Sequence, residues 1–122
     1  MVDASIRAMR RIDDKNRVGA STLEAYENIK LLDVIRETLL CKGVGVVNSD
    51  RYIYKKLLED SALYLYDLKS NATNRLFVGL TIDRLCQVHG LAHEKSDKLV
   101  MVPVDIYNEV NEINNRYKRR YL

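Results

Sequence analysis

Cys86, His89 and His93 are the residues whose types and spacing could hold a metal ion. Thiolate sulfur and imidazole nitrogen both bind zinc well, and Cys41 could supply a fourth ligand. On a continuous helix, steps of three and four residues place side chains on one face. Gly90 lies between the two histidines, however, and a glycine there commonly ends a helix, which would separate the ligands. We therefore predict no metal site, with Cys86 as a small core residue and two surface histidines, and zinc binding is the alternative.

The sequence offers little for a catalytic site. The adjacent carboxylates of Glu59 and Asp60 would point about 100° apart on a helix, so they would not converge on one substrate. Gly43 and Gly45 follow a predicted helix and lack the third glycine and the lysine of a phosphate-binding loop. No grouping of Ser, His and Asp, or of Cys and His, is readable from the spacing. We expect a binding protein and not an enzyme, with no cofactor and no small-molecule substrate.

The C-terminal end, residues 116–122, carries four basic and no acidic side chains. The body, residues 20–115, has 11 basic and 14 acidic residues, a net charge of −3, and the N-terminal arm, residues 1–19, is net +2. Cations neutralise phosphates, and interleaved tyrosines stack on unpaired nucleobases. We predict that the basic ends bind nucleic acid or an acidic protein, and a solvated helix end is the alternative. The residues concerned are Arg116, Tyr117, Lys118, Arg119, Arg120 and Tyr121, with Arg10 and Arg11 in the arm.

A helix-turn-helix unit with its turn at Gly90 is a second candidate element for nucleic-acid binding. Cys86 supplies the small residue four positions before the turn, and Leu91 an apolar residue after it. His89 and Ser96 occupy positions that should be apolar, and the segment that follows is not basic enough for a recognition helix. We therefore expect an ordinary helix–turn connection at this place.

Four of the eight tyrosines fall in one predicted helix and cannot all face one core. Some of them must be exposed, and tyrosine is enriched at protein interfaces. This cluster predicts a protein contact surface, for an adaptor or for assembly into a homo-oligomer. Its members are Tyr52, Tyr54, Tyr64 and Tyr66.

The elements that must position these residues are predicted to be helices. Five glycines and one proline in 122 residues are few for a fold built from strands and turns. No apolar run approaches the roughly 18 residues that span a bilayer, and the N-terminus lacks a signal-peptide core, so we expect a cytoplasmic protein without membrane contact. Segments rich in Asn, Tyr, Lys and Ile resemble those of small phage or mobile-element proteins. The expected fold is one mainly α domain over 1–122, a compact bundle of four to five helices with at most two short strands.

Apolar residues at steps of three and four place the individual helices. In the first segment these are Ile6, Met9 and Ile12. A polar connector over 69–74 is expected to cap the helix that follows it. The predicted helices cover 4–12, Ser21–Lys42, 51–68, the stretch from 75 to the stop at Gly90, and the stretch from Asp105 into the basic end.

Two short stretches, 44–47 and 99–102, are predicted to be strands because they are rich in β-branched residues. Residues 63–66 could be a third, but no turn separates them from the preceding helix, so helix is preferred. The helix before Gly90 is expected to bury one apolar side, formed by Leu76, Phe77, Leu80, Leu85 and Val88. In the final helix, Ile106, Val110 and Ile113 are expected to face inward.

Overall fold

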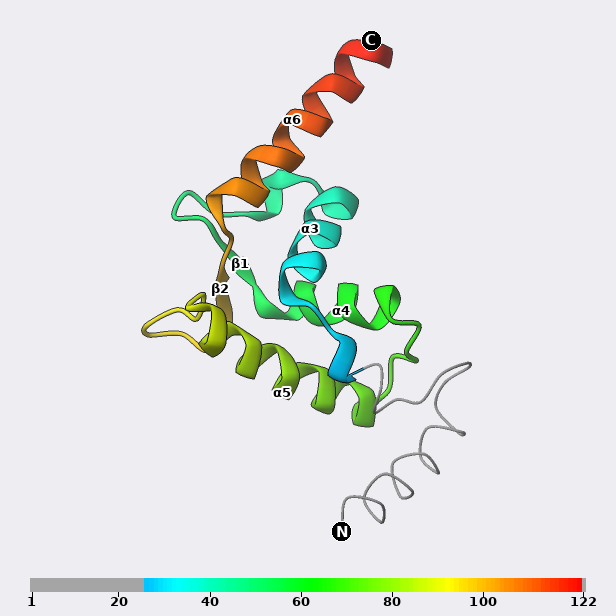
Figure 1. The fold of residues 1–122 in the computed structure, drawn as a ribbon, viewed down its shortest axis with the longest axis vertical. Helices are drawn as coiled ribbons and strands as arrows, with labels where there is room; N and C mark the ends of the chain where they lie inside the picture. The colour runs from blue at the N-terminus through cyan, green and yellow to red at the C-terminus, as the bar shows by residue number, and fades with distance from the viewer. Residues whose placement is uncertain (1–25, 122) are drawn as a thin grey trace.

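The computed structural model describes residues 26–121, and the side chains of residues 26–116 (Figure 1). The predicted helix over 4–12 and the predicted helix cap at Ser21 therefore lie outside the described residues. The elements in chain order are α3 (Leu31–Lys42), the short 3₁₀ helix η1 (Val44–Val46), β1 (Tyr52–Tyr54), α4 (Lys55–Leu65), α5 (Ala72–His89), β2 (Leu99–Met101) and α6 (Val104–Tyr121). This arrangement confirms the mainly helical fold class.

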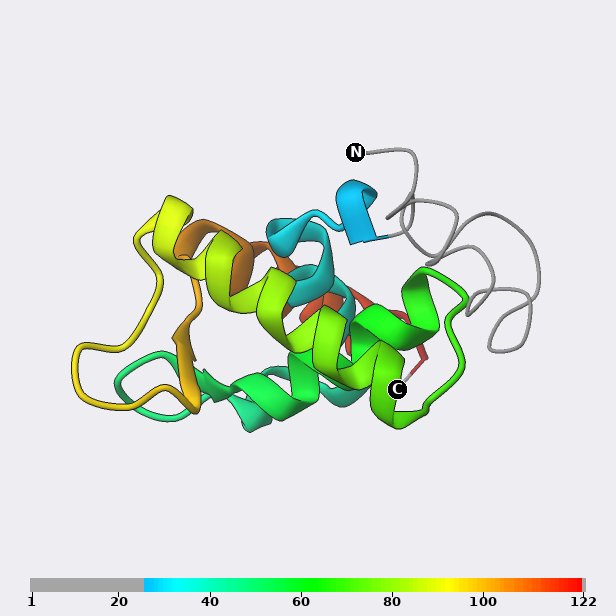
Figure 2. The same cartoon turned by 90° about the horizontal axis from the view of Figure 1, so that it is seen from below.

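The core lies between α3, α4 and α5, and α6 packs on α3 through its first turns (Figure 1). α4 and α5 are joined by residues 66–71, and α5 crosses α4 in Figure 2. Burial of branched aliphatic side chains drives this packing. The completely buried ones include Val34, Ile35, Leu39, Leu58, Val78, Ile82 and Val110. In the described part of the chain, no helix is long and apolar enough to cross a membrane.

The strand pair differs in part from the prediction. β1 and β2 are antiparallel, with Ile53 opposite Val100, and a further bridge joins Ala92 to Val100. Residues 92–101 therefore form a hairpin after α5, and the predicted strand at 99–102 is confirmed. The prediction of a helix beginning at residue 51 is wrong, because the alternating Tyr-Ile-Tyr segment finds a distant strand to pair with.

The predicted strand at 44–47 is also wrong, because this segment is the 3₁₀ helix η1. Its N–H groups donate to carbonyl oxygens three residues earlier in the chain. The N–H of Val47, for example, donates to the carbonyl of Val44 at 3.1 Å. Residues 63–65 end α4 as helix, which confirms the preferred assignment there.

The long helix predicted from Ser21 to Lys42 is interrupted. Lys30 is extended (φ −112°, ψ 113°), and α3 begins only at Leu31. The N–H of Lys30 donates to the hydroxyl of Tyr66 at 2.9 Å, and the hydroxyl of Tyr26 donates to Asn74 Oδ1 at 2.7 Å. The bond from the Lys30 N–H replaces a helical one, and the Tyr26 bond attaches the preceding residues to α5; sequence periodicity detects neither contact.

α5 ends at the expected residue, Gly90, but the side of the helix that faces the core is not the predicted one. Asn71 caps its start by accepting the N–H of Asn74 at 2.8 Å, and Gly90 ends it in the left-handed conformation (φ 68°). The residues facing the core are Asn74, Val78, Gly79, Ile82 and Cys86. Of the five predicted to be inward, Phe77 and Leu85 are half-buried, whereas Leu76, Leu80 and Val88 are 59%, 55% and 74% exposed. In α6, Ile106 and Val110 face inward as predicted, but Ile113 is exposed.

Candidate functional site

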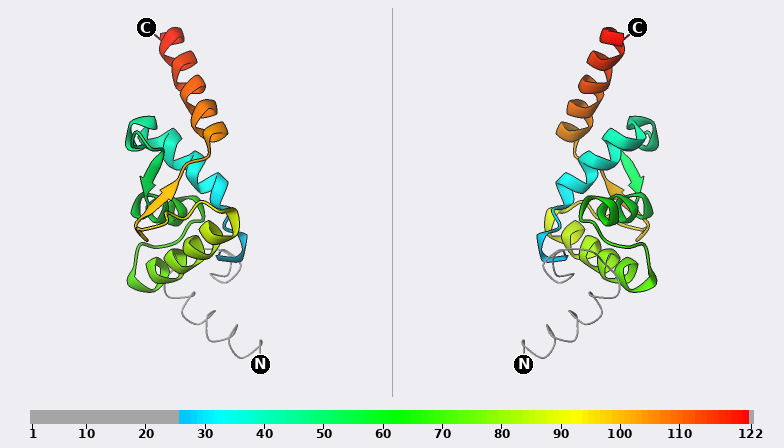
Figure 3. Two further views of the ribbon diagram at one scale, coloured as in Figure 1. Left: turned by 90° about the vertical axis from the view of Figure 1, so that its left-hand side faces the viewer. Right: turned by 90° about the vertical axis from the view of Figure 1, so that its right-hand side faces the viewer.

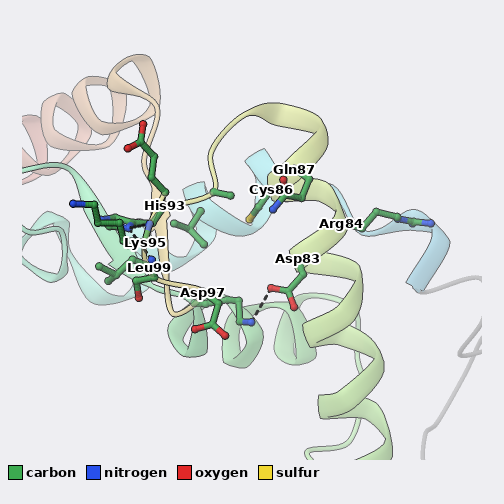
Figure 4. Close-up of a pocket in the computed structure, with 13 residues that line it drawn as sticks. Asp83, Arg84, Cys86, Gln87, His93, Lys95, Asp97 and Leu99 are labelled. Atoms are coloured by element: carbon green, nitrogen blue, oxygen red, sulfur yellow. Dashed lines mark hydrogen bonds and ion pairs between the residues drawn. The ribbon is translucent and has the colours of Figure 1, made fainter.

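A groove of about 730 Å³ lies between the second half of α5 and the hairpin that follows it (Figure 4). Its cationic side chains are Lys55, Arg84 and Lys95, and its carboxylates are Asp83, Glu94 and Asp97. Because the two signs balance, the groove has no net attraction for a phosphate. In Figure 4, Asp83 points toward the hairpin whereas Arg84 points away from it.

An ion pair closes one side of this groove. Lys55 Nζ lies 2.7 Å from Asp83 Oδ1, which ties the start of α4 to the middle of α5. Burial lowers the pKa of Lys55, but the hydrogen bond and the charge of Asp83 raise it further, so the net shift is upward. The amine therefore stays charged at neutral pH and holds α4 against α5.

The three residues considered for zinc do not act together. Cys86 is 3% exposed, and burial raises the pKa of its thiol to about 11, so it is a neutral core residue as predicted. His89 is exposed in the last turn of α5. Among the described residues, no three His, Cys, Asp or Glu side chains gather closely enough to hold a metal ion.

His93 has a structural role that its sequence position does not reveal. Its Nδ1 accepts the backbone N–H groups of Lys95 and Ser96, each at 3.0 Å. Its ring meets that of Tyr52 edge-on, with 4.6 Å between centroids. The side chain is half-buried, so the prediction of a surface histidine is wrong here. His93 fixes the tip of the hairpin against β1.

The helix-turn-helix unit considered at Gly90 is absent, as expected, because no helix follows within residues 91–98 of the described chain. α4 and α5 are the consecutive helices that do pack on each other, and residues 66–71 join them. The predicted helix over 51–68 already contained α4, but the crossing of the two helices comes from their packing and not from a local motif.

The basic C-terminal end is part of α6, which continues as helix to Tyr121. Val110 is the last buried side chain described in α6, and beyond it the helix leaves the body (Figure 3). Arg116 forms an exposed ion pair with Glu112, one turn earlier. For Tyr117, Lys118, Arg119, Arg120 and Tyr121 the structure describes the helical backbone only. Arg10 and Arg11 lie outside the described residues.

The four tyrosines predicted as one surface separate into two places. Tyr52 and Tyr54 belong to β1, before α4, whereas Tyr64 and Tyr66 lie at its far end. Tyr54 and Tyr64 are 63% and 79% exposed. Tyr52 and Tyr66 are half-buried, in contact with His93 and with the Lys30 N–H respectively. The structure therefore leaves two exposed tyrosines, at opposite ends of α4.

One surface was missed by sequence reasoning. We call Leu76, Leu80 and Val88 the α5 outer face, since they follow at steps of four and eight residues and are all exposed. The spacing of these three residues indicates one side of a helix, and this side was predicted to face the core. No family model, no curated protein and no solved structure matches this chain. Its function is therefore inferred from its own surfaces.

Proposed function

We propose that this protein is a non-enzymatic accessory or regulatory component of a nucleic-acid-handling complex, and that the basic end of α6 contacts phosphate. The observation that carries the proposal is the length of α6 beyond the body. The helix continues to Tyr121, eleven residues after its last described buried side chain, Val110. Four of the last seven residues of the chain are basic. A helix that projects into water presents such cations to a polyanion without obstruction by the core.

The ion pair already present on this part of α6 does not oppose the proposal. Arg116 and Glu112 have side chains that are 69% and 64% exposed. Such exposed pairs contribute at most about 1 kcal/mol, because water and salt screen them. The guanidinium of Arg116 can therefore exchange Glu112 for a phosphate at little cost.

The order of elements gives a second support. α4 and α5 are consecutive helices that pack on each other, with α3 completing the core, β1 before α4 and a hairpin after α5. In helix-turn-helix proteins the second helix commonly lies in the major groove of DNA, and the first crosses the backbone. The position of α5 at the surface is compatible with such docking (Figure 2).

The chemistry of α5, however, is poorly suited to reading sequence. Its outer face presents Leu76, Leu80 and Val88, whereas specific contacts to base edges are made mainly by Arg, Lys, Asn and Gln. The exposed polar residues in the second half of α5 are Asp83, Arg84, Gln87 and His89. The proposal therefore assigns the affinity to phosphate contacts by α6 and includes no sequence specificity.

The test is binding to a fluorescently labelled DNA duplex and to the corresponding single strand, followed by anisotropy. Replacing Lys118, Arg119 and Arg120 with Gln should weaken binding by at least about tenfold at low salt, because three phosphate contacts are lost. The matched control replaces three exposed cations of the body with Gln, which gives the same change in net charge. These are Lys30, Lys42 and Lys69. Equal weakening by both variants would indicate a general charge effect and contradict the proposal.

A protein–protein adaptor is the second candidate, and the exposure of Tyr54 and Tyr64 favours it. Large exposed aromatic side chains are typical of interface centres. If these tyrosines mediate self-assembly, light scattering should give a mass above the monomer, and Tyr64→Ser should reduce it. A monomer at all concentrations would exclude self-assembly as their role.

A further inference from the structure

The outer face of α5 is an apolar surface that nothing in the described structure covers. Leu76 and Leu80 are one turn apart and more than half exposed, and Val88 continues the row two turns later. Arg84 interrupts the row and makes no ion pair with any described residue. Phe77, half-buried, lies at the edge between this face and the core. A row of large apolar side chains on a single-domain surface commonly marks a binding surface.

The chain enters the described structure beside this face. Tyr26 is the first described residue, and the centroid of its ring lies 5.5 Å from the centroid of the Phe77 ring. The hydroxyl of Tyr26 donates to Asn74 Oδ1 at 2.7 Å, so this residue is attached to the first half of α5. The 25 residues that precede it therefore begin next to Asn74 and Phe77, in the same first half of α5 as Leu76 and Leu80.

We propose that residues 1–25 bind the α5 outer face of the same molecule, with Ile6, Met9 and Ile12 as the contacting side chains. The spacing of these three places them on one side of a helix, and Arg7 and Arg11 then fall on the opposite side. From Leu76 to Val88 the face is about 18 Å long. The 13 residues from 13 to 25 can extend to roughly 43 Å, which is enough to bring the helix back along it.

Size and charge favour this occupant over a second copy. Stable protein–protein interfaces bury about 800 Å² on each partner, which is more than a row of three aliphatic side chains offers. A segment attached to the same molecule reaches millimolar effective concentration and needs less contact area. Asp13 and Asp14 come directly after Ile12 and supply carboxylates for Arg84.

Hydrogen exchange followed by mass spectrometry tests the proposal on the full chain. Leu80→Glu places a charge in the face and should accelerate exchange across residues 1–25 by about tenfold, which corresponds to a docked population of roughly 90% in the wild type. Leu76→Glu should have the same effect. The matched control is Leu40→Glu, because Leu40 is an exposed leucine of α3, 42% exposed and away from α5. It should leave exchange in 1–25 unchanged.

Two results would overturn the proposal. The first is exchange in residues 1–25 that is unaffected by both α5 variants, which would mean that this segment does not bind the face. The second is protection that increases with protein concentration, together with a doubled mass that Leu80→Glu abolishes. A second copy would then occupy the face. Protection that is independent of concentration and lost only in the α5 variants supports the proposal.

Discussion

α5 and α6 are both 18 residues long, but apolar side chains are distributed differently around them. α6 buries Ile106 and Val110 along one side, and its other sides are largely polar. α5 buries Val78 and Ile82 on one side and exposes Leu80 on the other. A helix that is apolar on one side needs one neighbouring element to bury that side, whereas a helix that is apolar on two sides needs two such elements. α6 can therefore end as a free charged projection, while α5 still has an apolar side exposed to solvent among the described residues.

The largest difference between the two sides of α5 should appear in its stability, when one side chain from each side is truncated. Ile82 is completely buried, so Ile82→Ala should lower the free energy of unfolding by about 2–5 kcal/mol, through lost burial and the cavity left behind. Leu80 is 55% exposed, so Leu80→Ala should cost less than about 1 kcal/mol. Urea denaturation measures both. Equal costs would show that the two sides of α5 are buried alike, contrary to the fold described above.

A smaller effect sharpens the description of the inner side of α5. Burial raises the pKa of the Cys86 thiol to about 11, from an ordinary value of 9.0. Because the folded state holds this proton more tightly than the unfolded state, its contribution to stability is complete below pH 9. It is lost as the pH rises toward 11.

The matching measurement is the free energy of unfolding between pH 9 and pH 11. It should fall by about 2 kcal/mol more in the wild type than in Cys86→Ala. Cys41→Ala is the control, because Cys41 is exposed and its pKa is raised mainly by the hydrogen bond with Glu37, so this variant should keep most of the pH dependence of the wild type. Identical pH dependence in the wild type and Cys86→Ala would show that Cys86 titrates as if it were in water.

Most of the helices could be predicted from the sequence, because their signals are local. The end of α5 at Gly90 and the helical course of the basic end depend on neighbouring residues only, whereas α5 begins at Ala72, three residues before the predicted start. The strand at Tyr52–Tyr54 could not be predicted in this way, since its partner, Leu99–Met101, lies far along the chain. The break at Lys30 has the same origin, because it depends on the hydroxyl of Tyr66.

The side of α5 that faces the core could not be predicted from the local sequence, for a different reason. Apolar residues occur on two sides of this helix, and periodicity alone does not say which of them meets the core. Gly79 lies on the buried side, where a carboxylate oxygen of Glu59 would lie 3.5 Å from a Cβ atom. A Cβ atom at that distance makes an ordinary van der Waals contact, so close packing does not require a glycine here and Gly79 alone does not identify the inward side.

We expect the projecting end of α6 to bind phosphate, and the salt dependence of DNA affinity measures this contact. Four phosphate contacts predict a slope of about −3.6 for the logarithm of the binding constant against the logarithm of salt concentration. Replacing Lys118, Arg119 and Arg120 with Gln should reduce the slope to about −0.9. A slope that the triple variant leaves unchanged, or the absence of any salt-dependent binding by the wild type, would contradict this expectation.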